Sequence, residues 1–423
     1  MSTRRNALAV LAAASLVLAG CGSSGDSTST SSGTSGSAGA GSGETITIGS
    51  IHPLTGGLAG AGQLMQDATE MAAADINAAG GIKALGGAKL KIASGDSQGK
   101  AEVGQSEAQR LITSGAVALV GTYQSDVTKN VASVAERSKV PLIIDVAVDD
   151  SILAQGYKYS FRIQPNATGM GTSGADDLVG IGEQGGAPIK TASYIHIQGA
   201  FGDSVFTAFK KEAEAKGIKI LKEVAYDGSS LNDAAPQVSE AAAGNPDAIV
   251  VTGYYPDSLL IAKALAALKP KVKAVYGIAN GGFDDDSFPA QAAAAGTGLL
   301  SANYHYDATS ARVKDVRARF ETKYKMPMET AAVLSYQAVE VAAAGLEKSA
   351  SKDPAKLRDA ISGLQVKDPL LAFDGPITFD ETGQNKNATV IVMQIQGGKV
   401  EQVYPKKFQT VPLKFPAPPG VAG

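Results

Sequence analysis

The stretch VALVGTYQSDVTKNVASVAERSKVPLII, residues 117–144, carries the pattern from which the fold is predicted. Val117–Val120 is a short apolar run typical of a buried strand, and Asp126–Arg137 has apolar residues at helical spacing. Pro141–Ile144 is a second buried run. A strand, a helix and another strand in this order predict a βαβ unit with parallel strands covered by helices.

The same alternation continues on both sides of this unit and restarts near residue 191, which predicts two α/β lobes in series with parallel sheets. The further strands that we expect are Thr45–Ile51, Lys89–Ala93, Thr191–Ile197, Ile218–Val224, Ala248–Val251, Val272–Tyr276, Ala388–Gln396 and Lys399–Val403. The further helices are Gln63–Ala79, one ending near Leu111-Ile112, Asp203–Lys216, Asp233–Ala243, Asp257–Leu268 and a long helical stretch from Ser310 to Ser349.

The N-terminal residues predict export. Arg4 and Arg5 precede an apolar run that is shorter than the roughly 20 residues needed to span a bilayer, as in a secretory signal over residues 1–20. Leu-Ala-Gly-Cys ends at Cys21, the only cysteine in 423 residues, and resembles a bacterial lipobox in which Cys21 is lipidated. An ordinary cleaved signal is the alternative, and the paired arginines leave twin-arginine export open beside general secretion.

Residues 21–43 are almost entirely Gly, Ser, Thr and Ala and predict a flexible tether. The Pro-rich tail at 411–423 is expected to be irregular. We therefore expect a protein held by a lipid anchor on the extracytoplasmic face of the cell membrane.

The composition of the body narrows the possible partners. Without residues 1–20, 36 basic and 41 acidic residues remain, and there is no basic cluster. A mildly acidic chain of this kind argues against a nucleic acid or an anionic membrane surface as partner. With one cysteine the body forms no internal disulfide, so burial must stabilise it.

Two strand-to-helix turns repeat each other. Residues 120–126 read VGTYQSD, and residues 252–257 read TGYYPD. In each, a strand ends in Gly, an aromatic residue follows, and a helix begins. Ligands bind beyond the carboxyl ends of parallel strands, where helix N-termini favour a carboxylate. Both turns are therefore expected to line one cleft between the lobes, although two routine βα turns would give the same pattern.

Ten short motifs follow one another along the chain. They begin at Ile46 (ITIG), Pro53 (PLTGG), Ala74 (ADINAAGG), Ala118 (ALVG), Val140 (VPLI), Phe161 (FR), Phe201 (FGD), Asn245 (NPDA), Gly253 (GYYPD) and Asp374 (DGPITFD). In this order and spacing, the chain resembles the branched-chain amino-acid-binding receptors of ABC importers. The resemblance covers about residues 44–405.

This resemblance implies a clamshell of two lobes joined by three chain crossings. The first lobe would be 44–164 plus 303–376, and the second 165–302 plus 377–410. Hinge closure over a bound ligand would then be recognised by a partner permease with separate ATPase subunits. The chain itself has no Gly-x-x-x-x-Gly-Lys-Ser/Thr motif, so the ATPase must be another polypeptide. We expect a monomer.

The resemblance also implies the ligand-binding residues. Ser125 matches a serine that holds the ligand carboxylate, and its simpler role is to begin a helix. Ala147 matches a residue whose carbonyl accepts from the ligand amino group. Tyr254 and Phe201 match aromatic residues on the second lobe. Tyr123 and Gln124 fall where the family sets side-chain specificity.

Two departures leave the ligand open. The family has a second-lobe Glu that pairs with the ligand ammonium, but the matching stretch here offers Ala279 and Asn280. Asp149 stands where a Thr is common. Burying an unpaired charge is costly, so either Asp149 replaces the missing Glu or the ligand carries no ammonium group. Amino acids, amides and small polar or aromatic acids all remain candidates.

Three other functions were weighed against this one. A dinucleotide-binding enzyme is disfavoured because the glycines of residues 57–62 do not form Gly-x-Gly-x-x-Gly. A hydrolase is disfavoured because there is no Gly-x-Ser-x-Gly and because His52, His196 and His305 are isolated. We therefore expect no catalysis, no cofactor and no metal. A sensory receptor of the same fold remains an alternative.

The acidic runs at 149–150, 176–177 and 284–286 are interpreted as helix-start or solvated charges, with Ca²⁺ at the last run as a minor alternative.

Overall fold

The computed structural model describes residues 44–418, so the predicted signal, Cys21 and the tether lie outside the described residues. The first sheet has five parallel strands in the order β2-β1-β3-β4-β5. Their bounds are β1 Thr45–His52, β2 Lys89–Asp96, β3 Ala118–Gly121, β4 Leu142–Ile144 and β5 Ser160–Arg162. Every residue of β3 and β4 is buried, as expected for central strands with helices on both faces.

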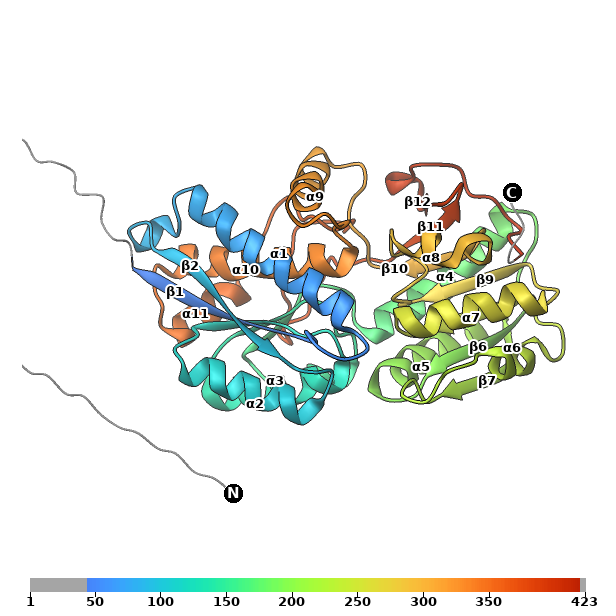
Figure 1. Cartoon of the computed structure of the whole chain (residues 1–423), viewed down its shortest axis with the longest axis horizontal. Coiled ribbons are helices and arrows are strands. Elements are labelled where there is room, and N and C mark those ends of the chain that lie inside the picture. The colour runs from blue at the N-terminus through green and yellow to red at the C-terminus, as the bar shows by residue number, and fades with distance from the viewer. Residues whose placement is uncertain (1–43, 419–423) are drawn as a thin grey trace, which may run out of the picture. The chain divides into compact units, whose positions relative to one another are not determined.

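Helices cover both faces of this sheet (Figure 1). They are α1 Ala59–Ala78, α2 Ala101–Thr113, α3 Ser125–Ser138, α9 Ala311–Tyr324, α10 Thr330–Ser349 and α11 Pro354–Ser362. Helix α1 packs against α10, and α2 packs against α3. Buried residues in α3 include Val127, Val131 and Val134, which recur at three- and four-residue spacing and form the stripe that faces the core.

One expected helix is two. The sequence predicted a continuous helical stretch from Ser310 to Ser349, but α9 ends at Tyr324 and α10 begins at Thr330. Lys325 adopts a left-handed conformation, with φ of 61°, and ends α9. Pro327 follows and cannot continue the helix. The break places Glu329 at the N-terminus of α10, which becomes important below.

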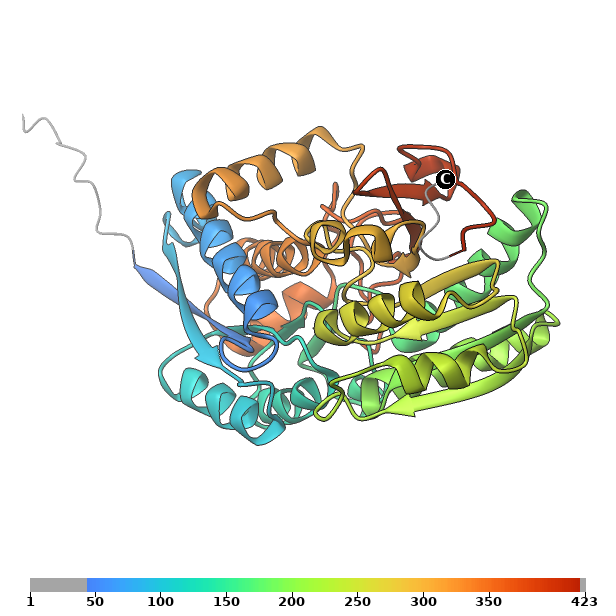
Figure 2. The same cartoon turned by 45° about the vertical axis from the view of Figure 1, so that its right-hand side comes forward.

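The second sheet has seven strands in the order β12-β11-β10-β9-β8-β6-β7. Their bounds are β6 Thr191–Ile197, β7 Lys219–Tyr226, β8 Ala248–Thr252, β9 Ala274–Ile278, β10 Leu300–Asn303, β11 Ile391–Gln396 and β12 Lys399–Tyr404. Strands β6 to β10 are parallel, and the hairpin of β11 and β12 adds to β10 in antiparallel orientation. Figure 2 shows this C-terminal hairpin, in red, beside strands from the middle of the chain. The prediction of an α/β fold with two mainly parallel sheets is confirmed.

The helices of the second sheet include two, the first and the last along the chain, that the sequence pattern did not reveal. They are α4 Ala167–Gln184, α5 Ala200–Ala215, α6 Ala235–Ala242, α7 Tyr255–Leu268 and the short α8 Phe288–Ala292. Helix α4 holds several glycines, which are weak helix formers. Close packing explains the glycine at position 171, because a Cβ there would lie 2.5 Å from the backbone nitrogen of Phe209 on α5.

The chain passes between the two sheets three times. It leaves the first sheet after Arg162 and leaves the second after Asn303. On the last passage, the loop after Ile377 hydrogen-bonds to β5 through Gln384 and Asn385 before the chain enters β11 at Ile391. Within residues 44–418, no helix combines the length and apolar character needed to cross a membrane.

Candidate ligand-binding site

The turn after β3 directs three predicted residues toward the carboxyl end of the first sheet. Gly121 has φ of 127°, and a Cβ there would lie 2.4 Å from the carbonyl oxygen of Ile51. Only glycine fits this close approach of β3 to β1. The chain then runs through Tyr123 and Gln124 into α3, which begins at Ser125.

The N-terminus of α3 is suited to an anion. Its first-turn N–H groups have no partner within the helix, and among the described residues no side chain caps them. The Ser125 hydroxyl is buried, and it accepts a hydrogen bond from the Asp149 backbone N–H at 3.3 Å. Its own proton remains free to be donated. Helix N-termini carry partial positive charge, so this end of α3 can bind a carboxylate.

Aromatic side chains from both sheets meet opposite this helix. The ring centroid of Tyr254, the residue before α7, lies 5.5 Å from that of Tyr123 and 5.2 Å from that of Phe201 in α5. The Tyr254 backbone N–H donates to the Asp257 carboxylate at 3.3 Å, which fixes the start of α7. The three rings give the site an apolar wall, with phenolic hydroxyls available as hydrogen-bond donors.

These groups enclose a cavity of about 30 Å³ between residues of both sheets. Its lining residues are Tyr123, Ser125, Val146, Ala147, Val148, Phe201, Gly253, Tyr254, Ala279, Gly281, Asn303 and Tyr304. Tyr304 follows β10 and donates its hydroxyl to the carbonyl of Val146 at 3.4 Å. This cavity is the smallest of the three described around Tyr123 and Tyr254, so a solute of amino-acid size extends into the adjoining space or needs the sheets to separate.

Burial raises the pKa of Tyr123, Tyr254 and Tyr304, and nearby ionisable groups, among them Asp284 and Asp257, add to this effect. The phenols are therefore neutral at physiological pH. The hydroxyls of Tyr123 and Tyr254 can donate hydrogen bonds to an acceptor such as a carboxylate, which an ionised phenolate could not do, whereas that of Tyr304 already donates to Val146.

Five of the eight residues expected at the ligand line this cavity, namely Tyr123, Ser125, Ala147, Phe201 and Tyr254. Gln124 instead lines a neighbouring cavity of about 520 Å³ together with Gln98 and Asp126. The Ala147 carbonyl already accepts from Gln164 Nε2 at 2.8 Å and from Arg162 Nη1 at 3.4 Å. This carbonyl is therefore poorly placed to accept from a ligand ammonium as well.

The other two expected residues have structural partners. The Asp149 carboxylate accepts from the Ser151 N–H at 3.1 Å and the Ser151 hydroxyl at 2.6 Å, and it lies 3.8 Å from Lys129 Nζ. Asn280 is fully buried, and its Oδ1 accepts from the N–H groups of Gly282 and Phe283, both at 2.9 Å. Neither lines the small cavity, so the structure places no carboxylate from Asp149 there.

Comparison with known proteins agrees with this architecture. A family model described as "Periplasmic binding protein" matches residues 45–399. The chain belongs to the periplasmic binding protein family. "Leu/Ile/Val-binding protein homolog 8" of Brucella abortus (strain 2308) is 27% identical over 383 residues, which cover 88% of this chain and 93% of the relative.

Two solved structures show the same fold. One is a solute-binding protein of an ABC transporter from R. palustris in complex with benzoate, with a TM-score of 0.74 at 21% identity. The alignment covers 90% of this chain and 98% of that protein's chain. The substrate-binding protein LivJ from Streptococcus pneumoniae, in complex with isoleucine, has a TM-score of 0.74 at 22% identity, with coverage of 86% and 100%. Membership in a family of binding proteins agrees with the expectation that the chain is not an enzyme.

The sequence interpretation missed several lining residues of this periplasmic binding protein. Asn303 ends β10 and Tyr304 follows it, and this four-residue strand was not predicted. Ala279 adopts φ of 49°, which is uncommon for a residue with a side chain. The only signal for these positions was their place just after apolar runs, at the carboxyl ends of strands.

Proposed function

We propose that the protein is a lipid-anchored, extracytoplasmic solute-binding protein of an ABC importer, which binds a small carboxylate ligand between its two lobes and delivers it to a permease. The lobes are residues 44–164 plus 303–376 and residues 165–302 plus 377–410. One observation carries this proposal. The uncapped N-terminus of α3 on the first sheet faces Phe201 and Tyr254 from the second sheet across one cavity.

The ligand class follows from the chemistry of that cavity. Ser125 and the first turn of α3 supply donors for a carboxylate. The rings of Tyr123, Phe201 and Tyr254 supply a flat apolar wall for an aliphatic or aromatic group. Isoleucine and benzoate are bound by the two solved structures compared above, and each combines a carboxylate with an apolar group. We therefore propose amino acids and small aromatic acids as candidate ligands.

Binding is proposed to close the lobes. A ligand that contacts Ser125 on one lobe and Tyr254 on the other favours the closed arrangement by its differential affinity for it. A permease can recognise this closed form. A sensory partner could recognise it equally, and co-purification with a permease is the observation that separates transport from sensing.

Ser125→Ala and Tyr254→Ala test the bridged site. Loss of a hydrogen bond to a charged ligand costs roughly 1.5–3 kcal/mol, so Ser125→Ala should weaken binding by about 10- to 150-fold. Tyr254→Ala should cost about 2 kcal/mol or more if the ring is a central anchor. Each variant is measured by calorimetric titration with the ligand and by urea unfolding without it.

Ser133→Ala is the matched control, because Ser133 also lies on α3 but does not line the cavity. Weaker binding by both site variants, with the stability of the empty protein within about 1 kcal/mol of the parent, supports the proposal. Parental affinity combined with early unfolding would assign that residue a structural role only.

A further inference from the structure

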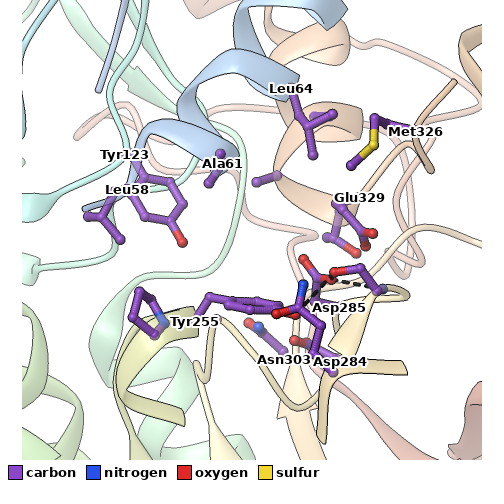
Figure 3. Close-up of a pocket in the computed structure, with 18 of the residues that line it drawn as sticks. Leu58, Ala61, Leu64, Tyr123, Tyr255, Asp284, Asp285, Asn303, Met326 and Glu329 are labelled. Carbon is purple, nitrogen blue, oxygen red and sulfur yellow. Dashed lines mark hydrogen bonds between the residues drawn. The ribbon is translucent and has the colours of Figure 1, made fainter. Parts of the chain in front are cut away.

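A larger cavity of about 250 Å³ adjoins the small one. The two share Tyr123, Gly281, Asn303 and Tyr304 in their linings. The larger cavity also takes residues from both sheets, because α1 and the N-terminus of α10 pack on the first sheet and the loop after β9 belongs to the second. Figure 3 shows its two unlike walls, one apolar and one acidic.

The acidic wall consists of Asp284, Asp285 and Glu329 (Figure 3). Asp284 and Glu329 are each 6% exposed. Among residues 44–418, no Lys or Arg forms an ion pair with any of these three carboxylates, whereas the adjacent Asp286 pairs with Arg317. Buried carboxylates without a cationic partner are costly, so their presence at a cavity requires an explanation.

Unpartnered atoms at the same wall point to a missing ligand group. Asp284 Oδ2, Glu329 Oε1 and the Thr330 hydroxyl are buried and have no hydrogen-bond partner within the described part of the chain. The other oxygen of Glu329 is occupied, because it accepts from the Asp286 N–H at 2.8 Å. Thr330 lines the cavity as well. A group that donates hydrogen bonds would fit at these three oxygens, although the Glu329 carboxyl also interacts with the neighbouring Asp285 carboxyl.

The opposite wall limits the kind of donor. It is formed by Leu58, Ala61 and Leu64 at the N-terminal end of α1, and Met326, beside Glu329, lines the cavity together with the aromatic residues Tyr123, Tyr255 and Tyr304. Among the described residues, no group of three or more His, Cys, Asp or Glu side chains is arranged to hold a metal ion. An organic cation on an apolar stem matches both walls, and aromatic faces attract such cations further.

We propose that this cavity is a subsite for a positively charged nitrogen group of the ligand, a primary ammonium or a guanidinium carried away from the ligand carboxylate on an apolar stem. Asp284, Asp285 and Glu329 hold the cation, and Ser125 holds the carboxylate across Tyr123. This inference rests on the proposed function, since it names the ligand class of that site.

The cation also contributes to closure. Asp284 and Asp285 follow β9 of the second sheet, whereas Glu329 precedes α10 against the first. A bound cation that contacts carboxylates from both sheets bridges them, so ligand charge and closure are coupled.

Binding of the cation is also coupled to the release of protons from these carboxyl groups. Burial, with the neighbouring carboxylates, raises the pKa of Asp284 to about 8, that of Asp285 to about 6 and that of Glu329 well above its usual value. The other ionisable groups around them are Asp286 with its partner Arg317, Tyr255, Tyr306 and His305, whose pKa burial lowers to about 4. An empty cavity therefore holds protons near neutral pH, and a cation displaces them.

Calorimetric titration of the purified protein near pH 7 tests the inference with two matched pairs. L-lysine and L-norleucine share a stem and differ in the terminal ammonium, as do 4-(aminomethyl)benzoate and 4-methylbenzoate. In at least one pair the charged member should bind at least tenfold more tightly, which corresponds to about 1.4 kcal/mol. Its apparent binding enthalpy should vary with the ionisation enthalpy of the buffer, because protons are released.

Asp284→Asn and Glu329→Gln should each reduce that preference at least tenfold while leaving the uncharged member within threefold of its parental affinity. Asp359→Asn, whose carboxylate is 66% exposed on α11, is the control. Equal affinities within both pairs, a preference that survives in both variants, or no binding by all four probes would overturn the inference. Binding without a charge preference would overturn this inference but not the proposed function. The proposed function is contradicted only if no compound in a broad panel of amino acids, amides and aromatic acids binds.

Discussion

The stability of the empty protein should fall as the pH rises, because Asp284 keeps its proton in the folded state longer than in the unfolded chain. Its pKa is about 8 in the folded protein, against an ordinary value of 3.8 for an Asp carboxyl group. Between about pH 4 and pH 8 the folded protein therefore binds up to one more proton at this group. Because of this extra proton, the free energy of unfolding falls by up to about 1.4 kcal/mol for each unit that the pH rises.

Asp284→Asn removes this contribution, since an amide does not titrate and resembles the protonated acid in shape. Between pH 5 and pH 7 the variant should show a pH slope shallower than the parent by up to about 1.4 kcal/mol per unit. Other carboxyl groups whose pKa burial raises, among them Asp285, Glu329 and Asp177, contribute to the remaining slope. Urea unfolding at half-unit pH steps, without ligand, measures both slopes.

Asp359→Asn again serves as the control, because it removes an exposed carboxylate and should leave the slope unchanged. If Asp284→Asn unfolds with the parental pH slope, Asp284 is ionised in the folded protein. The account of a proton-holding cavity would then be refuted.

Three further predictions concern other parts of the chain. Arg162 is 1% exposed and donates to the Asp149 carbonyl and to Gln384, both at 2.8 Å. Arg162→Met should therefore lower the free energy of unfolding, measured by urea titration, by about 3 kcal/mol. A loss under about 1 kcal/mol would contradict this. Gly171→Ala should lower the free energy of unfolding by about 1–3 kcal/mol, because the added Cβ forces α4 and α5 apart. Unchanged stability in the same titration would show that the two helices can accommodate the Cβ. Cys21→Ser should move the protein from the membrane fraction to the medium or the soluble fraction, and unchanged fractionation without acyl mass on the N-terminal peptide would exclude the anchor.

The fold could be predicted because its central strands are short apolar runs bounded by turn signals. The strand Thr191–Ile197 agrees with the structure at both ends, and β3 and β8 differ from their predicted ranges by about a residue at an end. The pattern failed where local propensity was weak. Helix α4 contains Gly171, Gly174 and other glycines that serve packing, and β5 and β10 are only three and four residues long.

The site was accessible to sequence reasoning only in part. Tyr123, Ser125 and Tyr254 stood in or beside two repeated strand-to-helix turns, their ligand roles were implied by the family resemblance, and they meet at one cavity. The acidic run at 284–286 was interpreted as solvated or helix-start charge, but Asp284 is buried at a cavity. Glu329 lay inside a predicted continuous helix. Its approach to Asp286 depends on the break between α9 and α10 and spans 43 positions of sequence, which no local pattern reveals.

The proposed function rests on a ligand that stabilises the closed form, and a thermal-unfolding panel of amino acids, amides and small aromatic acids tests this most directly. A ligand present at 100 times its dissociation constant should add about 2.7 kcal/mol to the free energy of unfolding and raise the midpoint by several degrees. We predict such a shift for at least one carboxylate in the panel, and its loss in Tyr254→Ala at the same ligand concentration. A broad panel in which no compound moves the midpoint would contradict the proposed function.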